Sequence, residues 1–298
     1  MARQTTATRA VRAPAGVLGL GRTTAEILFR SGVYLMLLAG TVLTIFPYLW
    51  MLSASFKDHS ELFSYPPQLL PLVLRWENYL RLFDKWQFGH WFLSSVIVSA
   101  SQVVLATFIS GMGGFGFAKY NFRWRQPLFT LLVGSMMLPF WVYVIPLYVM
   151  MIWIGWVNSY LALIVPWVGS AFGIFLCRQY MLSLPSELLD AARIDGASEF
   201  RILWQIALPL ARPALGAVAI TIFLSSWNSF FWPLVILREQ TKYTIPVGLA
   251  LLLNLNVGQR EWGPLMAGSV LASLPIIVVF LFMQRQFISG MVTGAVKT

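Results

Sequence analysis

The stretch Pro185-Ser-Glu-Leu-Leu-Asp-Ala-Ala-Arg-Ile-Asp-Gly-Ala-Ser-Glu-Phe200 interleaves acidic and basic residues with small and apolar ones. Uncharged runs lie on both sides of it, between Arg125 and Arg178 and between Arg212 and Arg238. A helix needs roughly 20 apolar residues to cross the hydrocarbon core of a bilayer. A charged helical segment between such runs is typical of a surface on which another protein docks.

The composition indicates an integral membrane protein. Of the 298 residues, 58% are hydrophobic and only 11% are charged, whereas about 25% are charged in an average soluble domain. The net charge of +10 comes from Lys and Arg in short segments beside apolar runs, so it indicates a positive-inside signal and not a nucleic-acid-binding face. The single cysteine, Cys177, excludes an intrachain disulfide and a cysteine-based metal cluster.

The uncharged runs predict an all-α polytopic membrane protein with six transmembrane helices. A run as long as 125–178 must fold back, and we place its turn at 155–159, between a third span at 128–152 and a fourth at 160–176. The segments that we predict are a cytoplasmic N-terminal tail (1–30), a first transmembrane helix (31–56), an external loop with an interfacial helix near 76–88 (57–90), a core with the other five transmembrane helices (91–285) and a cytoplasmic C-terminal tail (286–298).

The positive-inside rule orients these spans. Most of the Lys and Arg lie on the cytoplasmic side when both termini are placed there. The charged stretch, extended to about residues 183–209, then becomes a cytoplasmic loop between the fourth and fifth spans.

Within this loop the sequence predicts two short helices. Pro185 and the neighbouring serines favour a helix start, and Gly196 favours a helix end, because glycine tolerates a positive φ. A second helix is expected over 198–207, ended by Pro209. Its apolar face should consist of Phe200, Leu203, Trp204 and Ala207.

The cores of the predicted spans contain no Asp, Glu, Lys, Arg or His. Ion-coupled carriers and proton pumps usually place such groups at membrane depth, so a secondary transporter is disfavoured. Polar and aromatic residues instead gather on the second span, as at Gln102, and on the fifth, where hydroxyls and indole rings could line a path for a sugar. The residues that we predict to line this path are Ser225, Trp227, Asn228, Ser229 and Phe230, with packing between helices as the alternative role.

Several motifs in order resemble one family. Residues 190–200, followed by Leu208-Pro-Leu-Ala-Arg-Pro213, resemble the EAA loop of binding-protein-dependent ABC importer permeases. The motif Ala192-Arg-Ile-Asp-Gly-Ala197 is similar to the carbohydrate branch of this family, and so are Trp227-Asn228 and Trp232-Pro-Leu234 in the fifth span. The similarity is notably to the second permease subunit of maltose-type systems. Further matches are Asn78-Tyr79, Met137-Leu-Pro139, residues 155–160 and the C-terminal tail.

The resemblance implies that the first short helix of the loop inserts into a cleft on a cytoplasmic ATPase subunit. It also implies that the C-terminal tail reaches the ATPase dimer, and that the outer loop between Leu237 and Gly263 contacts a solute-binding protein. One departure is Asp190, where the family usually has Glu. The candidate docking residues are Glu187, Asp190, Ala191, Ala192, Asp195, Gly196 and Ala197. The alternative for Asp190 and Asp195 is that they solvate the loop or pair locally with Arg193.

We therefore expect a permease subunit of an ATP-driven ABC importer in a bacterial or archaeal cell membrane, moving a sugar inward by alternating access. It is not itself an enzyme and binds no cofactor, because the sequence has no phosphate-binding Gly-x-x-x-x-Gly-Lys-Ser/Thr loop. ATP and Mg²⁺ would be bound by the partner ATPase subunits, and a second, different permease would complete the path. The alternative is the same architecture importing a glycerol phosphodiester or another polar metabolite.

Overall fold

The computed structural model describes residues 19–253 and 261–295, with the side chains of 26–253 and 261–284, and every regular element in these ranges is a helix. Two compact units are distinguished, up to Trp50 and from Met51 onward. The helical elements are α1 (Gly19–Ala54), α2 (His59–Leu62), α3 (Glu77–Asp84), α4 (Phe88–Lys119), α5 (Arg125–Ser135), α6 (Phe140–Trp153), α7 (Tyr160–Ile164), η1 (Val165–Trp167), α8 (Ala171–Leu182), α9 (Ser186–Ile194), α10 (Glu199–Ile202), η2 (Leu203–Ala207), α11 (Leu208–Leu210), α12 (Arg212–Trp227), α13 (Phe231–Ile236), η3 (Gln240–Lys242), α14 (Ile245–Leu253) and α15 (Trp262–Ala295).

Four helices are long and apolar enough to cross a membrane, namely Glu26–Ala54, Phe88–Lys119, Tyr160–Leu182 and Trp262–Gln284. Two bent pairs bring the number to six if each pair is one span. The prediction of an all-α membrane protein is therefore confirmed.

The ends of the first and last predicted spans need correction. Helix α1 begins at Gly19, so residues 19–30 of the predicted tail are helical, while residues 1–18 lie outside the described part of the chain. Helix α15 likewise continues to Ala295, through most of the predicted C-terminal tail at 286–298. Both extensions follow from sequences without a strong helix breaker beyond the apolar core.

Two predicted spans are broken. The third consists of α5 and α6, which meet at 99°. Pro139 caps the second of these helices with extended backbone, because proline lacks the N–H group that would continue the helix. The fifth span ends at Trp227, and the short helix α13 follows after a gap. The turn predicted at 155–159 lies between α6 and α7, where Gly155 and Asn158 have positive φ.

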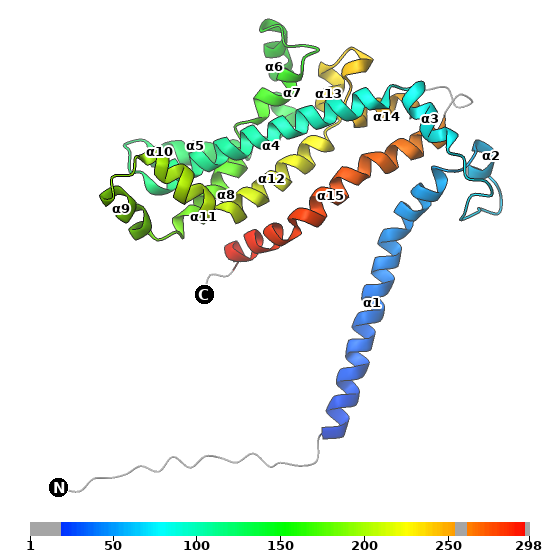
Figure 1. Ribbon diagram of the computed structural model, residues 1–298, viewed down its shortest axis with the longest axis horizontal. Helices are drawn as coiled ribbons and strands as arrows, with labels where there is room; N and C mark the ends of the chain where they lie inside the picture. The colour runs from blue at the N-terminus through cyan, green and yellow to red at the C-terminus, as the bar shows by residue number, and fades with distance from the viewer. Residues whose placement is uncertain (1–18, 254–260, 296–298) are drawn as a thin grey trace. The chain divides into compact units, whose positions relative to one another are not determined.

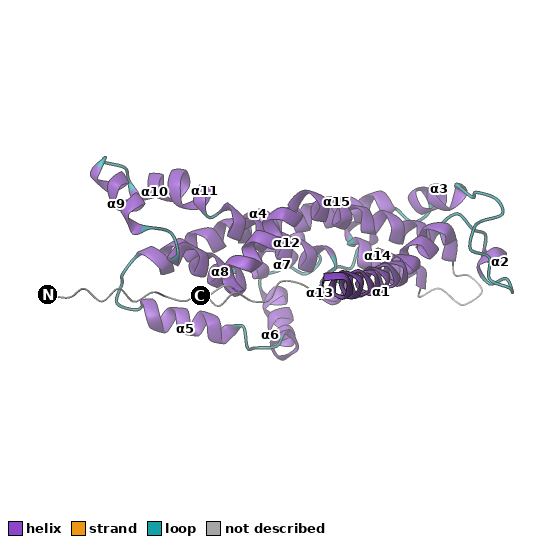
Figure 2. Cartoon of the chain, turned by 90° about the horizontal axis from the view of Figure 1, so that it is seen from below, coloured by secondary structure: helices purple, strands orange, loops and turns teal. Residues whose placement is uncertain are grey.

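Helices α4, α8, α12 and α15 form the elongated bundle of the second unit (Figures 1 and 2). Helix α4 runs from the α3 end of the bundle to the end that carries α9 and α10. At one level it lies directly against α8, since a Cβ added to Gly114 would be 2.5 Å from the Cβ of Cys177 and 2.8 Å from the backbone nitrogen of Arg178. Small residues permit such close approach of membrane helices.

In α1, the side chains from Glu26 to Leu49 are exposed. The hydroxyls of Thr41 and Thr44 donate to the carbonyls of Leu37 and Gly40 in the preceding turn, at 2.7 and 2.8 Å. These internal bonds leave α1 with an apolar surface on all sides, which suits lipid or another membrane helix.

We predict that Gly114→Ala destabilises the α4–α8 contact by about 1–3 kcal/mol, because the new methyl group overlaps backbone atoms of α8. The measurement is the thermal unfolding midpoint of the purified chain in detergent. Gly116→Ala is the matched control, since no atom lies within 4 Å of its added Cβ. Equal midpoints for the two variants would contradict this packing.

Candidate functional site

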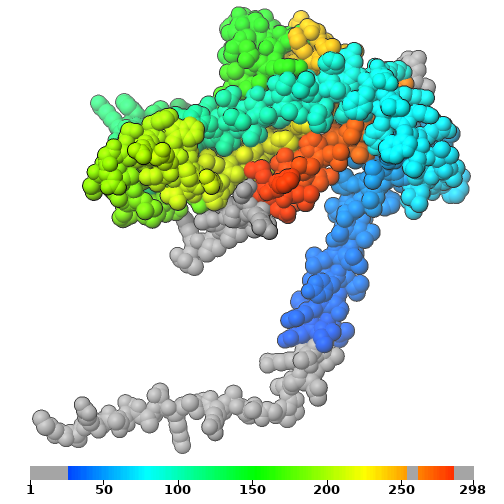
Figure 3. Space-filling view, in the orientation of Figure 1, coloured from blue at the N-terminus to red at the C-terminus, as the bar shows by residue number. Residues whose placement is uncertain are grey.

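The loop of residues 183–209, called the coupling loop below, forms two helical arms around Gly196. Helix α9 ends at Ile194, and Gly196 follows with φ +82°, which is favourable for glycine. The amide of Ala197 donates to the carbonyl of Ala192 at 2.9 Å, closing the helix end as in a Schellman motif. The elbow predicted at Gly196 is therefore present, and Figure 3 shows the coupling loop as the yellow-green mass at one end of the second unit.

The start of α9 differs from the prediction. Pro185 is the capping residue, and no side chain caps the helix. The Ser183 hydroxyl instead donates to the carbonyl of Tyr180 at 2.7 Å, and Ser186 Oγ lies 3.5 Å from Lys119 Nζ. The serines near α9 are thus engaged with neighbouring elements.

The second arm begins as predicted but continues further. Ser198 caps α10, accepting from the amide of Arg201 at 3.3 Å. The chain then widens into a π-helical turn at Leu203–Ala207 and stays helical through Pro209 to Leu210. The widened turn accommodates the proline, which has no N–H group to donate. The predicted helix over 198–207 therefore ends three residues too early, and this arm meets α12 at a bend of 77°.

The predicted apolar face of the second arm is split. Leu203 and Ala207 are buried against Phe115 and Met181, together with residues of both arms. Phe200 and Trp204 are exposed, and Trp204 stacks on Phe108 with 5.5 Å between ring centroids. The π-helical turn changes the helical period, so the four residues do not share one side.

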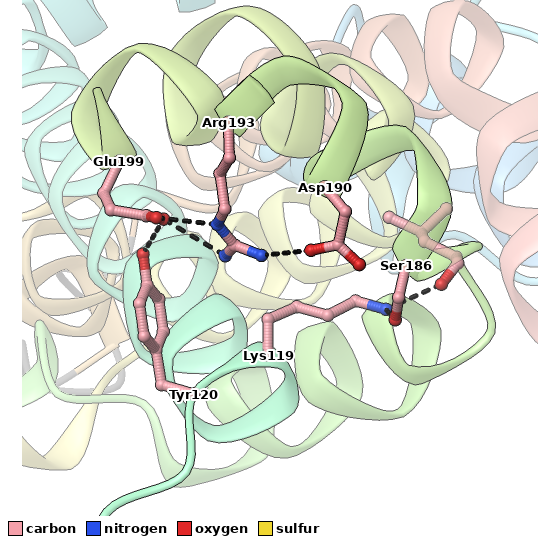
Figure 4. A network of polar contacts seen from close by, with 7 residues as sticks. Lys119, Tyr120, Ser186, Asp190, Arg193 and Glu199 are labelled. Carbon is pink, nitrogen blue, oxygen red and sulfur yellow. Dashed lines mark hydrogen bonds and ion pairs between the residues drawn. The ribbon is translucent and has the colours of Figure 1, made fainter. Parts of the chain in front are cut away.

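A chain of polar contacts connects the two arms with the end of α4 (Figure 4). Arg193 Nη1 lies 2.6 Å from Asp190 Oδ1, and Arg193 Nε lies 2.8 Å from Glu199 Oε1. The hydroxyl of Tyr120 donates to the other carboxylate oxygen of Glu199. Hydrogen bonds with Glu199 and Asp190 raise the pKa of Arg193, so its positive charge is secure. The carboxylate of Asp190 is thus paired within its own loop.

The candidate docking residues do not all face outward. Ala192 and Ala197 are half-buried against the cluster under the loop. Two exposed apolar residues that sequence reasoning missed, Leu188 and Ile194, are 49% and 87% exposed. The two residues are six positions apart and so lack the i, i+3 or i+4 spacing of one helical side, and periodicity alone would not have found them. The candidate docking residues that are exposed are Glu187, Asp190, Ala191, Asp195 and Gly196.

A cavity of about 690 Å³ lies between α4, α8, α12 and the α5–α6 break. No Asp, Glu, Lys, Arg or His occurs among the described residues that line it. Its polar groups are hydroxyls, an amide, a phenol and an indole, which suit hydrogen bonds and ring contacts with an uncharged solute. The residues that carry them are Gln102, Ser135, Tyr143, Trp167, Ser170, Thr221, Ser225, Ser226 and Ser229.

Of the five predicted path residues, Ser225 and Ser229 line this cavity. Trp227 is buried on another side of α12, and its indole N–H donates to the carbonyl of Ala272 at 2.9 Å. Asn228 donates its side-chain amide to the carbonyl of Leu224 at 2.8 Å, at the end of the helix. Phe230 is exposed but does not line the cavity. Ser225 and Trp227 are two residues apart on α12, so their side chains point to nearly opposite sides of the helix, and only the side of Ser225 faces the cavity.

Residues 110–292 match the family described as "Binding-protein-dependent transport system inner membrane component". The chain belongs to this family. It is 39% identical over 272 residues to the arabinooligosaccharides transport system permease protein AraQ of Bacillus subtilis (strain 168), covering 90% of this chain and 96% of the relative.

Other relatives carry names with different solutes. The lactose transport system permease protein LacG of Rhizobium radiobacter is 31% identical, covering 89% of this chain and 95% of the relative. The sn-glycerol-3-phosphate transport system permease protein UgpE of Yersinia pestis is also 31% identical, covering 87% and 94%. A solved bacterial ABC transporter involved in alginate import contains a chain with the same fold, with a TM-score of 0.80, 24% identity and coverage of 88% and 98%.

These matches establish the class of the chain. It is a membrane permease subunit of an ABC importer and not an enzyme, as the sequence predicts.

Proposed function

We propose that this permease moves a neutral sugar inward and that α9 is the element through which a cytoplasmic ATPase drives it. The coupling loop and both termini lie on the cytoplasmic side of the cell membrane in this proposal. The observation that carries it is the exposed face of α9, where Leu188 and Ile194 combine with acidic neighbours. An apolar patch with charges at its edge is typical of a protein interface.

In this proposal Asp190 stabilises the coupling loop and does not itself bind the ATPase. Because its carboxylate pairs with Arg193, the acids of α9 without an ion pair in the described structure, Glu187 and Asp195, are better placed to meet a cation of the ATPase. The ATPase subunits bind the ATP and Mg²⁺.

A sugar is the solute that the cavity favours. Its lining offers hydroxyls, the amide of Gln102 and the indole of Trp167, without a cationic group in its described part. A phosphate ester would favour Arg or Lys in the path, so glycerol phosphate is the second candidate, supported by the relative named for it. The relatives named for arabino-oligosaccharides and lactose support the sugar.

The remaining proposed partners are those expected for an ABC importer permease. A second, different permease completes the path, and an external solute-binding protein delivers the sugar. A solved alginate transporter in complex with its periplasmic protein, similar in fold at a TM-score of 0.60, supports the last of these.

We predict that Ile194→Ser weakens binding of the ATPase to the permease about 10- to 100-fold, because roughly 1.5–3 kcal/mol of apolar burial is lost. The measurement is retention of the ATPase subunit during purification of the complex at decreasing concentration. Ile194→Leu, which keeps an apolar side chain, should bind as the wild type does. Normal retention of Ile194→Ser would show that the ATPase docks elsewhere.

For the cavity, we predict that Ser229→Ala raises the sugar concentration needed for half-maximal uptake about three- to tenfold, since one hydrogen bond contributes roughly 0.5–1.5 kcal/mol. Uptake is measured in proteoliposomes of the assembled importer, using arabinotriose, lactose and sn-glycerol 3-phosphate. Ser269→Ala is the control, because the Ser269 hydroxyl bonds within its own helix and does not line the cavity. Uptake of glycerol phosphate alone would overturn the assignment of a sugar.

A further inference from the structure

Three helices of the bundle line the cavity, and two of them are continuous with the coupling loop. Helix α8 leads into the loop and contributes Ala171 and Phe172 to the lining. Helix α12 follows the loop and contributes Thr221 and Ser225. Helix α4 contributes Gln102 but lies far from the loop in the sequence. Movement of the loop therefore reaches α8 and α12 through the backbone, whereas α4 depends on side-chain contacts.

Lys119, the last residue of α4, and Tyr120, which follows it, both bind the coupling loop. Lys119 Nζ donates to the carbonyl of Leu184 at 2.6 Å, just before α9 begins. The hydroxyl of Tyr120 donates to Glu199, the first residue of α10. Figure 4 shows Lys119 pointing toward Ser186 at the start of α9, and Tyr120 pointing toward Glu199 at the start of α10. The end of α4 thus holds the loop at two points.

Arg193 makes the loop itself one unit. Its guanidinium bonds Asp190 within α9 and Glu199 across the elbow at Gly196. A guanidinium that pairs with two carboxylates fixes their relative orientation as well as their distance. A displacement of α9 is therefore shared by α10, to which Tyr120 is bonded.

The surroundings of Tyr120 favour a lasting hydrogen bond to Glu199. Its ring packs edge-on against Phe115 of α4, with 5.4 Å between centroids. Burial and the hydrogen bond to Glu199 raise the pKa of Tyr120 to about 12. The phenol therefore stays protonated, and remains a donor, at the pH of a cell.

We propose that Lys119 and Tyr120 are positioning residues that bind the coupling loop to α4, so that a movement imposed on α9 also moves the Gln102 wall of the cavity. The inference rests on the proposed docking of the ATPase at α9. Apolar contacts under the loop, such as Phe115 against Leu189 and Ile202 in the same cluster, resist separation, but they resist sliding much less. The directional hydrogen bonds of Lys119 and Tyr120 fix the position of the loop along α4.

The test is Tyr120→Phe in the complete importer, reconstituted in proteoliposomes. The variant keeps the aromatic packing on Phe115 and removes only the hydroxyl. The readout is the number of sugar molecules imported per ATP hydrolysed, using the best-imported member of a panel of arabinotriose, lactose and diacetylchitobiose. We expect a decrease of about three- to tenfold, corresponding to the net contribution of one ordinary hydrogen bond, with ATPase binding unchanged.

Tyr180→Phe is the matched control. Tyr180 packs against the same cluster, and within the described structure its hydroxyl has no hydrogen-bond partner. Its ratio of import to hydrolysis should stay within about twofold of wild type, below the change expected for one hydrogen bond. A Tyr120→Phe importer with the wild-type ratio would overturn the proposal.

A second measurement is independent of the solute. Spin labels at Val104 of α4 and Phe200 of the loop, both exposed, are introduced after Cys177→Ala. The distance between them should stay constant on ATP binding in the otherwise wild-type complex and change in the Tyr120→Phe complex. A distance that changes equally in both would also overturn the proposal, whereas an ATPase that binds normally to Ile194→Ser would refute the docking site instead.

Discussion

The close contact of α4 with α8 at Gly114 is the constraint on which the rest of the second unit depends. In a membrane, apolar side chains gain little by leaving lipid for a protein neighbour, so helix association relies on close packing and a few hydrogen bonds. At Gly114 the two backbones approach until even a methyl group would overlap. Because α8 leads directly into α9, the same contact determines where the coupling loop lies relative to α4.

The polar residues are divided between two places with different physical demands. At the end of the bundle, Arg193 pairs with Asp190 and Glu199, and Tyr120 completes the chain of contacts. In the cavity the polar groups of the described lining carry no charge. In the proposed function, the coupling loop transmits movement and therefore needs strong directional bonds. The cavity instead needs uncharged polar groups, which bind a neutral solute weakly enough to release it. The bundle connects the two places over the length of α4.

The sequence predicts the helical class, the turn at 155–159 and the elbow at Gly196, because long apolar runs and a glycine with positive φ leave local signals. It does not predict the angle of 99° at which α5 and α6 meet, or which side of α12 faces the cavity. The i,i+3 spacing of Asp190 and Arg193 allows the ion pair that the structure shows, but the second contact of Arg193, to Glu199 across the elbow, has no local signal. These features depend on which helix faces which, and local periodicity does not encode that.

The central claim is that the coupling loop and the cavity walls act as one connected body. Structures of the assembled importer with and without ATP, determined by electron cryomicroscopy, test it most directly. The account predicts that α9 is seated in the ATPase in both states, and that the loop moves together with Gln102 of α4 while the contact between Tyr120 and Glu199 persists. A coupling loop that shifts against α4, or a cavity that reorganises while the loop remains in place, would contradict it.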